Sequence, residues 1–374
     1  MDNLKVALTV LVVLHHVGQP YGDSGGFWYF EQADRWSLLR PFFAVNASFF
    51  MGLFFFVSAY FLPGSYDRKG AGPFLRDRLQ RLGIPLVVLL LTAVPLITYF
   101  SYVNFRGSPL PFGEYLTQVF FGGGPKPEGW RGPNWPEVHF AHLWFVEHLL
   151  VYALLYAGLR LAWRGKPLFQ GRADVPPSDG AILAFTLLLT AVTLLVRLWY
   201  PLDRWVGLLG FIQLEPAHLP QYLSFFVLGT VAARQGWLTS LPARQGMRWL
   251  AAGLAAAVLM VICVLVLRHI LPAGLYFVVR TIVESFIAVG LSLGLIILFR
   301  ERANGTSRLG RILAENAYGA YLFHVPLVVA LQYAAAPLRL SAASKFFLVG
   351  AVSVVVTFWF SHLVRMIPGA RRIL

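Results

Sequence analysis

Long apolar runs recur along this sequence, and they constrain its fold more than any other feature. A helix needs about 20 mostly apolar residues to cross a bilayer. Ten such runs lie near residues 4–20, 42–62, 82–102, 140–162, 180–200, 219–236, 249–268, 276–299, 312–334 and 345–365. The short run at 219–236 would cross as a tilted or amphipathic segment inside a bundle. The sequence therefore predicts an all-α, polytopic transmembrane helical bundle of about ten spans.

The composition agrees with a membrane fold. Hydrophobic residues make up 57% of the 374 residues and charged residues only 13%, about half the share in soluble domains. Strand-like alternation between turns is not visible, which argues against a barrel. The first run is followed by bulky residues rather than by a small-residue cleavage site, so we expect a retained span. No repeat or soluble segment divides the chain, and residues 1–374 are predicted to form a single membrane-embedded domain.

The net charge of +14 would suggest a nucleic-acid partner in a soluble protein, but membrane topology explains it here. Lys and Arg gather in the cytoplasmic loops of membrane proteins. With a cytoplasmic N-terminus, most of the 31 Lys and Arg residues fall on that side. Both termini are then predicted to be cytoplasmic, and no nucleic acid is expected. The single cysteine, Cys263, is interpreted as a small buried side chain.

The first run carries ionisable residues near both of its ends. Lys5 and His16 are eleven positions apart, about 20° from three whole helical turns, and so share one face about 16 Å apart along the axis. His15 points about 100° away from His16 and is interpreted as a packing residue. Ionisable groups at membrane depth are costly and usually functional.

Four ionisable side chains are predicted at similar depth in the outer half of the bilayer. They are His16, Glu147, Glu284 and His324. Such groups are better explained by a shared polar cavity than by contact with lipid. A histidine beside a carboxylate is typical of general-base catalysis on a hydroxyl, and His16 is our candidate base.

A metal site is not expected in this chain. His139 and His142 are three positions apart and could share a face, but two ligands do not make a zinc site. The predicted polar cavity in the outer half of the bilayer could serve proton transfer or ion coupling, and the sequence leaves both open.

The segment FLRDRLQRLGIP at 74–85 is dense in cations on the predicted cytoplasmic side. Arg78 and Arg81, three positions apart, would share a helix face and could clamp phosphates. Together with Lys5 on the same side, they predict an anion-binding site at the cytoplasmic end of the bundle. A phosphate-bearing donor would dock inside, and an acceptor would arrive from outside.

Two predicted external loops, 21–41 and 103–139, are rich in Gly, Pro and aromatic residues. Trp130 and Trp135 lie in the most turn-rich segment of the second loop. Rigid turns with Trp suit a vestibule for a carbohydrate or another polar ligand. An interfacial aromatic belt would have the same composition, and the sequence leaves both interpretations open.

Several motifs follow one another along the chain: Lys5 and His16 with ten residues between them, FFFVSAYF at 54–61, Phe74, Arg78 and Arg81 before Ile84-Pro85, HLWFVEHLL at 142–150, and NAYGAYLFHVPL at 316–327. In this order they resemble the motifs of acyltransferase family three, the integral membrane O-acyltransferases that modify extracytoplasmic glycans, with Ala59 in place of the usual glycine. The resemblance covers nearly the whole chain. Lys5 stands where the family usually has arginine, and it keeps the charge without the guanidinium fork.

The resemblance implies transfer of an acyl group of acetyl or succinyl type from cytoplasmic acyl-CoA to a hydroxyl of an extracytoplasmic glycan or related acceptor. His16 would be the base or a transient acyl carrier, and Glu147 would orient it. Lys5, Arg78 and Arg81 would bind the donor. The cavity would be lined by His324, Tyr321, Glu284, Ser58 and Trp144, and the acceptor vestibule by Trp130 and Trp135.

Acyl-CoA would then be a co-substrate, with no permanently bound cofactor and no metal. The location would be the inner membrane of a bacterium, with the lipid bilayer as a partner. A proton-coupled secondary transporter and a glycan or lipid flippase are the alternatives for the His/Glu cavity. The pair Arg78 and Arg81 has a direct role only under the acyl-CoA interpretation.

Overall fold

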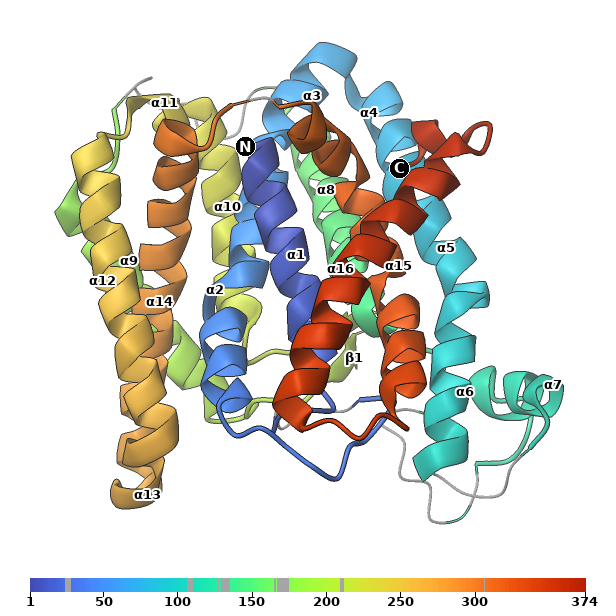
Figure 1. The fold of residues 1–374 in the computed structure, drawn as a ribbon. Coiled ribbons are helices and arrows are strands. Elements are labelled where there is room, and N and C mark those ends of the chain that lie inside the picture. Colours follow the sequence, from blue (N-terminus) through green and yellow to red (C-terminus); the bar gives the residue numbers. More distant parts are fainter. Residues whose placement is uncertain are drawn as a thin grey trace.

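The computed structural model describes residues 1–23, 28–105, 110–126, 128, 135–164, 166, 175–208, 212–305 and 307–374. Its long helices form one bundle (Figure 1). By length and composition, eight helical segments among these described residues could cross a membrane: Leu39–Lys69, Ala71–Asn104, Ala141–Ala162, Asp179–Arg197, Ala243–Ile270, Ala273–Arg302, Arg308–Ala335 and Ala342–Met366. The predicted all-α, polytopic membrane fold is confirmed.

Most of the described part of the chain is helical. The α-helices are α1 (Asp2–Gly18), α2 (Leu39–Tyr60), α3 (Leu62–Lys69), α4 (Ala71–Arg78), α5 (Ile84–Leu91), α6 (Ala93–Phe105), α7 (Phe112–Glu114), α8 (Trp144–Ala162), α9 (Asp179–Arg197), α10 (Leu219–Arg234), α11 (Trp237–Ser240), α12 (Ala243–Ile262), α13 (Arg268–Ile270), α14 (Ala273–Arg302), α15 (Arg308–Ala335) and α16 (Ala342–Met366). Three π-helical turns are η1 (Leu79–Gly83), η2 (Tyr115–Phe120) and η4 (Cys263–Leu267), and two 3-10 turns are η3 (Ala141–Leu143) and η5 (Ala370–Arg372).

Two of the ten predicted spans correspond to helices shorter than the other eight. Helix α1 has 17 residues and α10 has 16, which at about 1.5 Å per residue is shorter than a hydrocarbon core of about 30 Å. Both chain ends lie at the same end of the bundle (Figure 1), as an even number of spans requires. The count of ten and the cytoplasmic side of the termini stay predictions.

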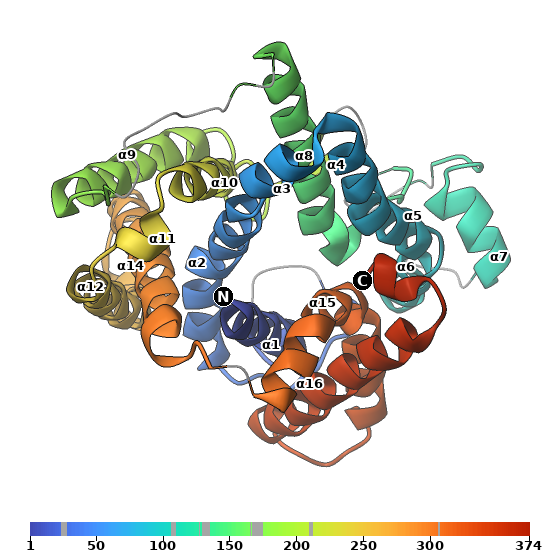
Figure 2. The same ribbon diagram turned by 90° about the horizontal axis from the view of Figure 1, so that it is seen from above.

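Helix α1 occupies the interior of the bundle. Leu4, Leu8, Val12 and Val17 are buried at helical spacing, and this apolar stripe is the face that packs inward. The helix contacts α2, α15 and α16, and Figure 2 shows it between α2 and the α15–α16 pair. Because α1 is surrounded by other helices, its two polar ends meet the side chains of several neighbours.

Close packing of α12 on α14 fixes the position of the charged residues that α14 carries. A Cβ atom added to Gly290 would lie 2.7 Å from the Cα of Gly253, so only glycine lets the two backbones approach this closely. Helix α9 packs against α14 as well. Charged groups on α14 are thereby held at a fixed depth in the bundle.

Two features differ from the expected organisation. The predicted span at 82–102 begins earlier, because helical structure runs from Ala71 to Asn104 through η1. The cations at 76–81 therefore lie within a helical segment rather than before it. The connection at 198–218 contains the antiparallel strands β1 (Val206–Leu208) and β2 (Ile212–Leu214), with Val206 opposite Leu214. The sequence did not predict this hairpin.

Candidate active site

A cavity of about 650 Å³ lies at the end of the bundle where α1 finishes. This volume is within the range of about 300–1,000 Å³ that is usual for small-molecule sites. Its walls come from α1, α2, the start of α8, the 198–218 connection, α14 and α15. We call it the outer cavity, and it contains His16.

His16 is held in one tautomer by its neighbours. Its Nδ1 lies 2.9 Å from the carbonyl oxygen of Val12 and 3.1 Å from Nε2 of His324. The Nδ1 of His324 lies 2.5 Å from the carbonyl oxygen of Tyr321. Carbonyl oxygens only accept, so both Nδ1 atoms carry the proton, and Nε2 of His324 is an acceptor. The neutral His16 ring therefore keeps a lone pair on Nε2, the form that a base or a nucleophile requires.

A third imidazole completes this cluster. The rings of His142 and His324 lie 5.1 Å apart, and Nε2 of His142 donates to the carbonyl oxygen of Leu322 at 2.9 Å. Pro326 stands four residues after Leu322 inside α15 and has no N–H to bond that carbonyl. His142 supplies the missing donor. The proline was the sequence signal that could have identified this partner.

Glu147 lies away from His16. It is buried in α8, and its Oε2 accepts from the backbone N–H of Gln213 in β2 at 3.3 Å. Its neighbour His148 donates from Nε2 to the carbonyl oxygen of Gln213 at 2.9 Å. Both side chains thus attach the hairpin to α8. Among the described contacts of Glu147 none reaches His16, so the orienting role of this carboxylate stays a prediction.

Glu284 shares the outer cavity with His16, as its depth in the sequence predicted. Two arginines hold its carboxylate: Arg197 of α9 forms an ion pair with Oε2, and Nε of Arg280 lies 2.9 Å from Oε1. The Nη1 of Arg197 also lies 3.3 Å from Oγ1 of Thr281. The sequence did not indicate the pairing with Arg197, because α9 and α14 are far apart in the chain.

The 198–218 connection adds three ionisable groups to the outer cavity: Asp203, Glu215 and His218. The backbone N–H of Asp203 donates to Oε1 of Glu215 at 2.8 Å, and Nε2 of His218 lies 3.8 Å from the same oxygen. Burial raises the pKa of Glu215 to about 7 and lowers the pKa of His218 to about 3. The cavity thus holds a neutral imidazole and a carboxyl group that titrates near neutrality.

Glu215→Gln is expected to flatten the dependence of stability on pH. The pKa of Glu215 is raised from 4.5 to about 7 in the folded protein, so the folded state binds this proton more tightly than the unfolded state. The stabilisation is fully present below about pH 4.5 and is lost as the pH rises through about 7. The parent should lose about 1–3 kcal/mol at this group across that interval, whereas the amide does not titrate.

The measurement is the thermal unfolding midpoint of the purified protein at pH 5 and pH 8. Glu114→Gln, at an exposed position in α7, is the matched control and should follow the parent. An equal loss of stability in Glu215→Gln and in the parent would contradict the assignment.

The remaining predicted outer residues are distributed as follows. Tyr321 and Trp144 line the outer cavity; the hydroxyl of Tyr321 donates to the carbonyl oxygen of His142 at 2.5 Å. Ser58 lies on α2 two residues before Tyr60, a lining residue of the second cavity, so the structure separates it from His16. Trp135 is half-buried against the hydrophobic core. Trp130 lies outside the described residues.

A second cavity, of about 490 Å³, lies at the opposite end of the bundle between α3, α4, η1 and α10. We call it the inner cavity. Within the described ranges, its lining contains one carboxylate, Asp77, and five cations: Arg68, Lys69, Arg78, Arg81 and Arg234. Arg78 and Arg81 thus share one cavity, as their spacing predicted. An excess of cations makes this a site for an anion.

Arg78 is the cation best placed to use this cavity. Its Nη2 lies 3.4 Å from Oγ of Ser65 and 4.0 Å from Oδ2 of Asp77, and its guanidinium lies 5.1 Å from the centre of the Phe74 ring. Its Nε is buried without a hydrogen-bond partner in the described part of the chain. A buried donor of this kind calls for an explanation, and an anionic ligand would provide one.

Arg234 and Lys5 differ in their relation to the inner cavity. Arg234 lines it and is fixed by Asp67, with Nη2 3.0 Å from Oδ1. Lys5 is not among its lining residues; its ammonium group lies 4.6 Å from the centre of the Phe61 ring, which does line the cavity, and 3.2 Å from Oδ1 of Asp2. Lys5 therefore borders the anion site that it was predicted to share.

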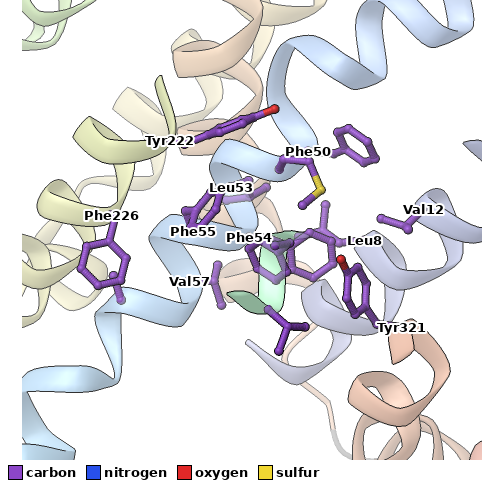
Figure 3. Packing of buried hydrophobic residues seen from close by; sticks show 14 of the residues in the cluster. Leu8, Val12, Phe50, Leu53, Phe54, Phe55, Val57, Tyr222, Phe226 and Tyr321 are labelled. Atoms are coloured by element: carbon purple, nitrogen blue, oxygen red, sulfur yellow. The ribbon is translucent and has the colours of Figure 1, made fainter. Parts of the chain in front are cut away.

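A packed aromatic layer separates the two cavities. On α2, Met51 lines the outer cavity and Tyr60 the inner one, about 13 Å apart along the helix. Phe54 and Phe55 lie between them and pack on Phe145 of α8, with ring centres 5.7 and 4.7 Å apart. Figure 3 shows the packing around this layer. The structure thus places a cation-lined site and an imidazole site on opposite sides of a hydrophobic layer. Among the described residues, no group of three or more His, Cys, Asp or Glu side chains could hold a metal ion.

Comparison with known proteins gives matches over much of the chain. A family model described as an acyltransferase domain, that of acyltransferase family three, matches residues 1–363. The chain is similar to the glucans biosynthesis protein C of Escherichia coli K12, with 26% identity over 251 residues, 62% of this chain and 57% of that protein. The protein of the same name from Salmonella paratyphi B is 25% identical over 249 residues, with the same two shares of 62% and 57%. The match thus spans little more than half the length of these curated relatives. No solved structure matches the chain.

Proposed function

This chain belongs to acyltransferase family three, and on that premise we propose that it transfers an acyl group from cytoplasmic acyl-CoA to a hydroxyl of an extracytoplasmic glycan. The observation that carries the proposal is the pairing of a five-cation cavity at one end of the bundle with an imidazole cavity at the other. Helices α1 and α2 run between the two ends. The arrangement suits a donor and an acceptor that approach from opposite sides of a membrane.

The inner cavity supports the donor half of the proposal. The diphosphate and the 3′-phosphate of CoA are multiply charged, and guanidinium groups bind phosphate through paired, charge-assisted hydrogen bonds. Arg78 and Arg81 come from the same helical segment, and Arg234 comes from α10. Three arginines from two elements can contact phosphates from more than one direction. A proton-coupled transporter or flippase would give this cation cluster no direct role.

The tautomer of His16 supports the chemical half. As a base, Nε2 would accept the proton of the acceptor hydroxyl while its oxygen attacks the thioester carbonyl. The carbon–sulfur bond then breaks, and the CoA thiolate takes the proton from the imidazolium. As an acyl carrier, Nε2 would itself attack the carbonyl and release the CoA thiolate; the hydroxyl oxygen would then attack the acyl-imidazole, free Nε2, and give its proton to the thiolate. Either route uses the same lone pair.

The acceptor and the location are inferred from the relatives and from the outer cavity. The curated relatives are bacterial and are named for glucan biosynthesis, so we infer a glycan acceptor and the inner membrane of a bacterium. The acyl group would be of acetyl or succinyl type. Acyl-CoA would act as a co-substrate, and no resident cofactor or metal is needed for the steps above.

Transfer of a labelled acyl group tests the proposal. The purified protein in lipid nanodiscs would be incubated with acetyl-CoA or succinyl-CoA labelled in the acyl carbon, together with glucan oligosaccharides. We expect label on the oligosaccharide in an ester that mild alkali releases, with one free CoA thiol formed per ester. Proton-coupled uptake of oligosaccharide into vesicles, without ester formation, would contradict the proposal.

A further inference from the structure

One wall of the outer cavity is a row of aromatic rings that the proposed chemistry does not use. Trp205 lies against Trp144, with ring centres 5.7 Å apart. Trp144 stacks on Tyr222 at 5.4 Å, and Tyr222 stacks on His218 at 5.7 Å. All four rings line the cavity. We call this row the aromatic wall; its outermost ring, Trp205, is 43% exposed.

Charged and hydrogen-bonding groups lie beside the aromatic wall. Asp203 and Glu215, joined through the backbone N–H of Asp203, line the same cavity. Arg280 also lines it, and its Nε is occupied by Glu284. Aromatic rings and carboxyl and guanidinium groups therefore line the same space.

Hydrogen bonds between the β1–β2 hairpin and α8 hold the aromatic wall in place. Gln213 in β2 is bonded through its N–H to Glu147 and through its carbonyl to His148, both in the first turns of α8. Trp144 begins that same helix. The hairpin that follows Trp205 is thus fixed to the helix that carries the ring beside it. A site fixed before binding loses less conformational entropy when its ligand binds.

This combination of groups fits a saccharide. A pyranose ring has an apolar face of C–H groups, which stacks on an aromatic face, and an edge of hydroxyl groups, which needs donors and acceptors. Aromatic side chains with a few directed polar groups are the usual lining of such sites. An interfacial Trp belt would face lipid instead, whereas these rings face a cavity that they share with His16.

We propose that Trp205, Trp144 and the Asp203–Glu215 pair form the acceptor subsite, in which one saccharide unit of the glycan stacks on Trp205. The inference rests on the proposed function, because it assigns the acceptor of that same reaction. Glu147 is then a positioning residue, because it holds the hairpin and thereby the subsite. The unit bound here presents a hydroxyl of the glycan to the part of the cavity that contains His16.

Trp205→Ala tests the subsite through the kinetics of acyl transfer. The KM for glucan oligosaccharides should rise about tenfold, equivalent to about 1.4 kcal/mol, because the saccharide loses the aromatic face on which it stacks. The KM for acyl-CoA should stay at the parent value. Trp205→Phe, which keeps an aromatic face, should recover much of the affinity. Trp199→Ala is the matched control: Trp199 is 61% exposed in the same connection, and this change should leave both KM values unchanged.

Two outcomes would overturn the subsite. The first is a Trp205→Ala variant with an unchanged KM for the oligosaccharide, and the second is a KM for acyl-CoA that rises equally. A binding measurement separates this failure from failure of the proposed function. Oligosaccharide titrations followed by tryptophan fluorescence and calorimetry should give saturable binding to the parent and much weaker binding to Asp203→Asn and Trp205→Ala. If the parent binds the oligosaccharide without acylating it, the subsite stands and the proposed reaction fails; equal binding by all three proteins rejects the subsite.

Discussion

His16→Ala is expected to lower the rate of acyl transfer by about 10²–10⁴-fold, the usual contribution of a positioned general base. The lone pair on Nε2 is fixed by the bonds from Nδ1 to Val12 and His324, and alanine removes it. The loss should appear in kcat rather than in the KM for acyl-CoA, since the inner cavity lies beyond the aromatic layer. The measurement is transfer of labelled acyl groups at saturating donor.

His362→Ala is the control for this variant, because His362 is exposed on α16 and should leave the rate unchanged. A His16→Ala protein that inserts normally and keeps more than a tenth of the parent rate would exclude His16 as the base and as the carrier. Rapid quenching of the parent protein with acyl-CoA but without acceptor separates the two roles. An acyl group on the His16 peptide indicates a carrier; its absence, in a preparation that turns over once acceptor is added, indicates a base.

Arg81→Gln is expected to raise the KM for acyl-CoA by about 10–100-fold, since hydrogen bonds to charged groups contribute about 1.5–3 kcal/mol. Arg81 lines the inner cavity together with Arg78 and Arg234. Glutamine keeps the side chain polar but removes the charge that a phosphate needs. Because the contact between Arg81 and a phosphate would stabilise the bound ground state and the transition state equally, kcat should change little.

Arg76→Gln provides the matched control, since Arg76 is an exposed residue of α4 outside the lining of the inner cavity. Dephospho-acyl-CoA identifies the phosphate involved: if Arg81 contacts the 3′-phosphate, the parent and Arg81→Gln should bind this analogue with similar KM. If Arg81→Gln and Arg76→Gln change the KM equally little, the arginines serve membrane topology alone.

Helical phase accounts for what the sequence could predict about the site. The eleven-residue spacing of Lys5 and His16 fixes their common face once α1 is a helix. The same reasoning placed Arg78 and Arg81 together, although η1 changes the turn between them. Depth along each helix also predicted that His324 would lie level with His16. These are properties of single helices, which a sequence contains directly.

The rotation of one helix relative to its neighbours cannot be read from the periodicity of a single segment. Glu147 was placed at the right depth, but α8 turns it toward β2 and away from His16. His142 became a partner of α15 because Pro326 leaves a carbonyl free, a relation between two distant segments. The aromatic wall depends on a hairpin of three-residue strands, which is too short for periodicity to indicate.

The packed layer around Phe54 and Phe55 also makes the molecule an electrical insulator. Ionic groups gather at both of its ends, so a voltage across the membrane falls mainly over these aromatic side chains. Moving one unit charge across the layer at a membrane potential of 100 mV would change its free energy by about 2.3 kcal/mol. For the proposed acyl-CoA donor, the phosphates would therefore stay in the inner cavity, and only the uncharged thioester arm would cross the layer. The transfer of an acetyl group, which is uncharged, would not depend on the membrane potential. The carboxylate of a succinyl group would be driven outward by an inside-negative potential.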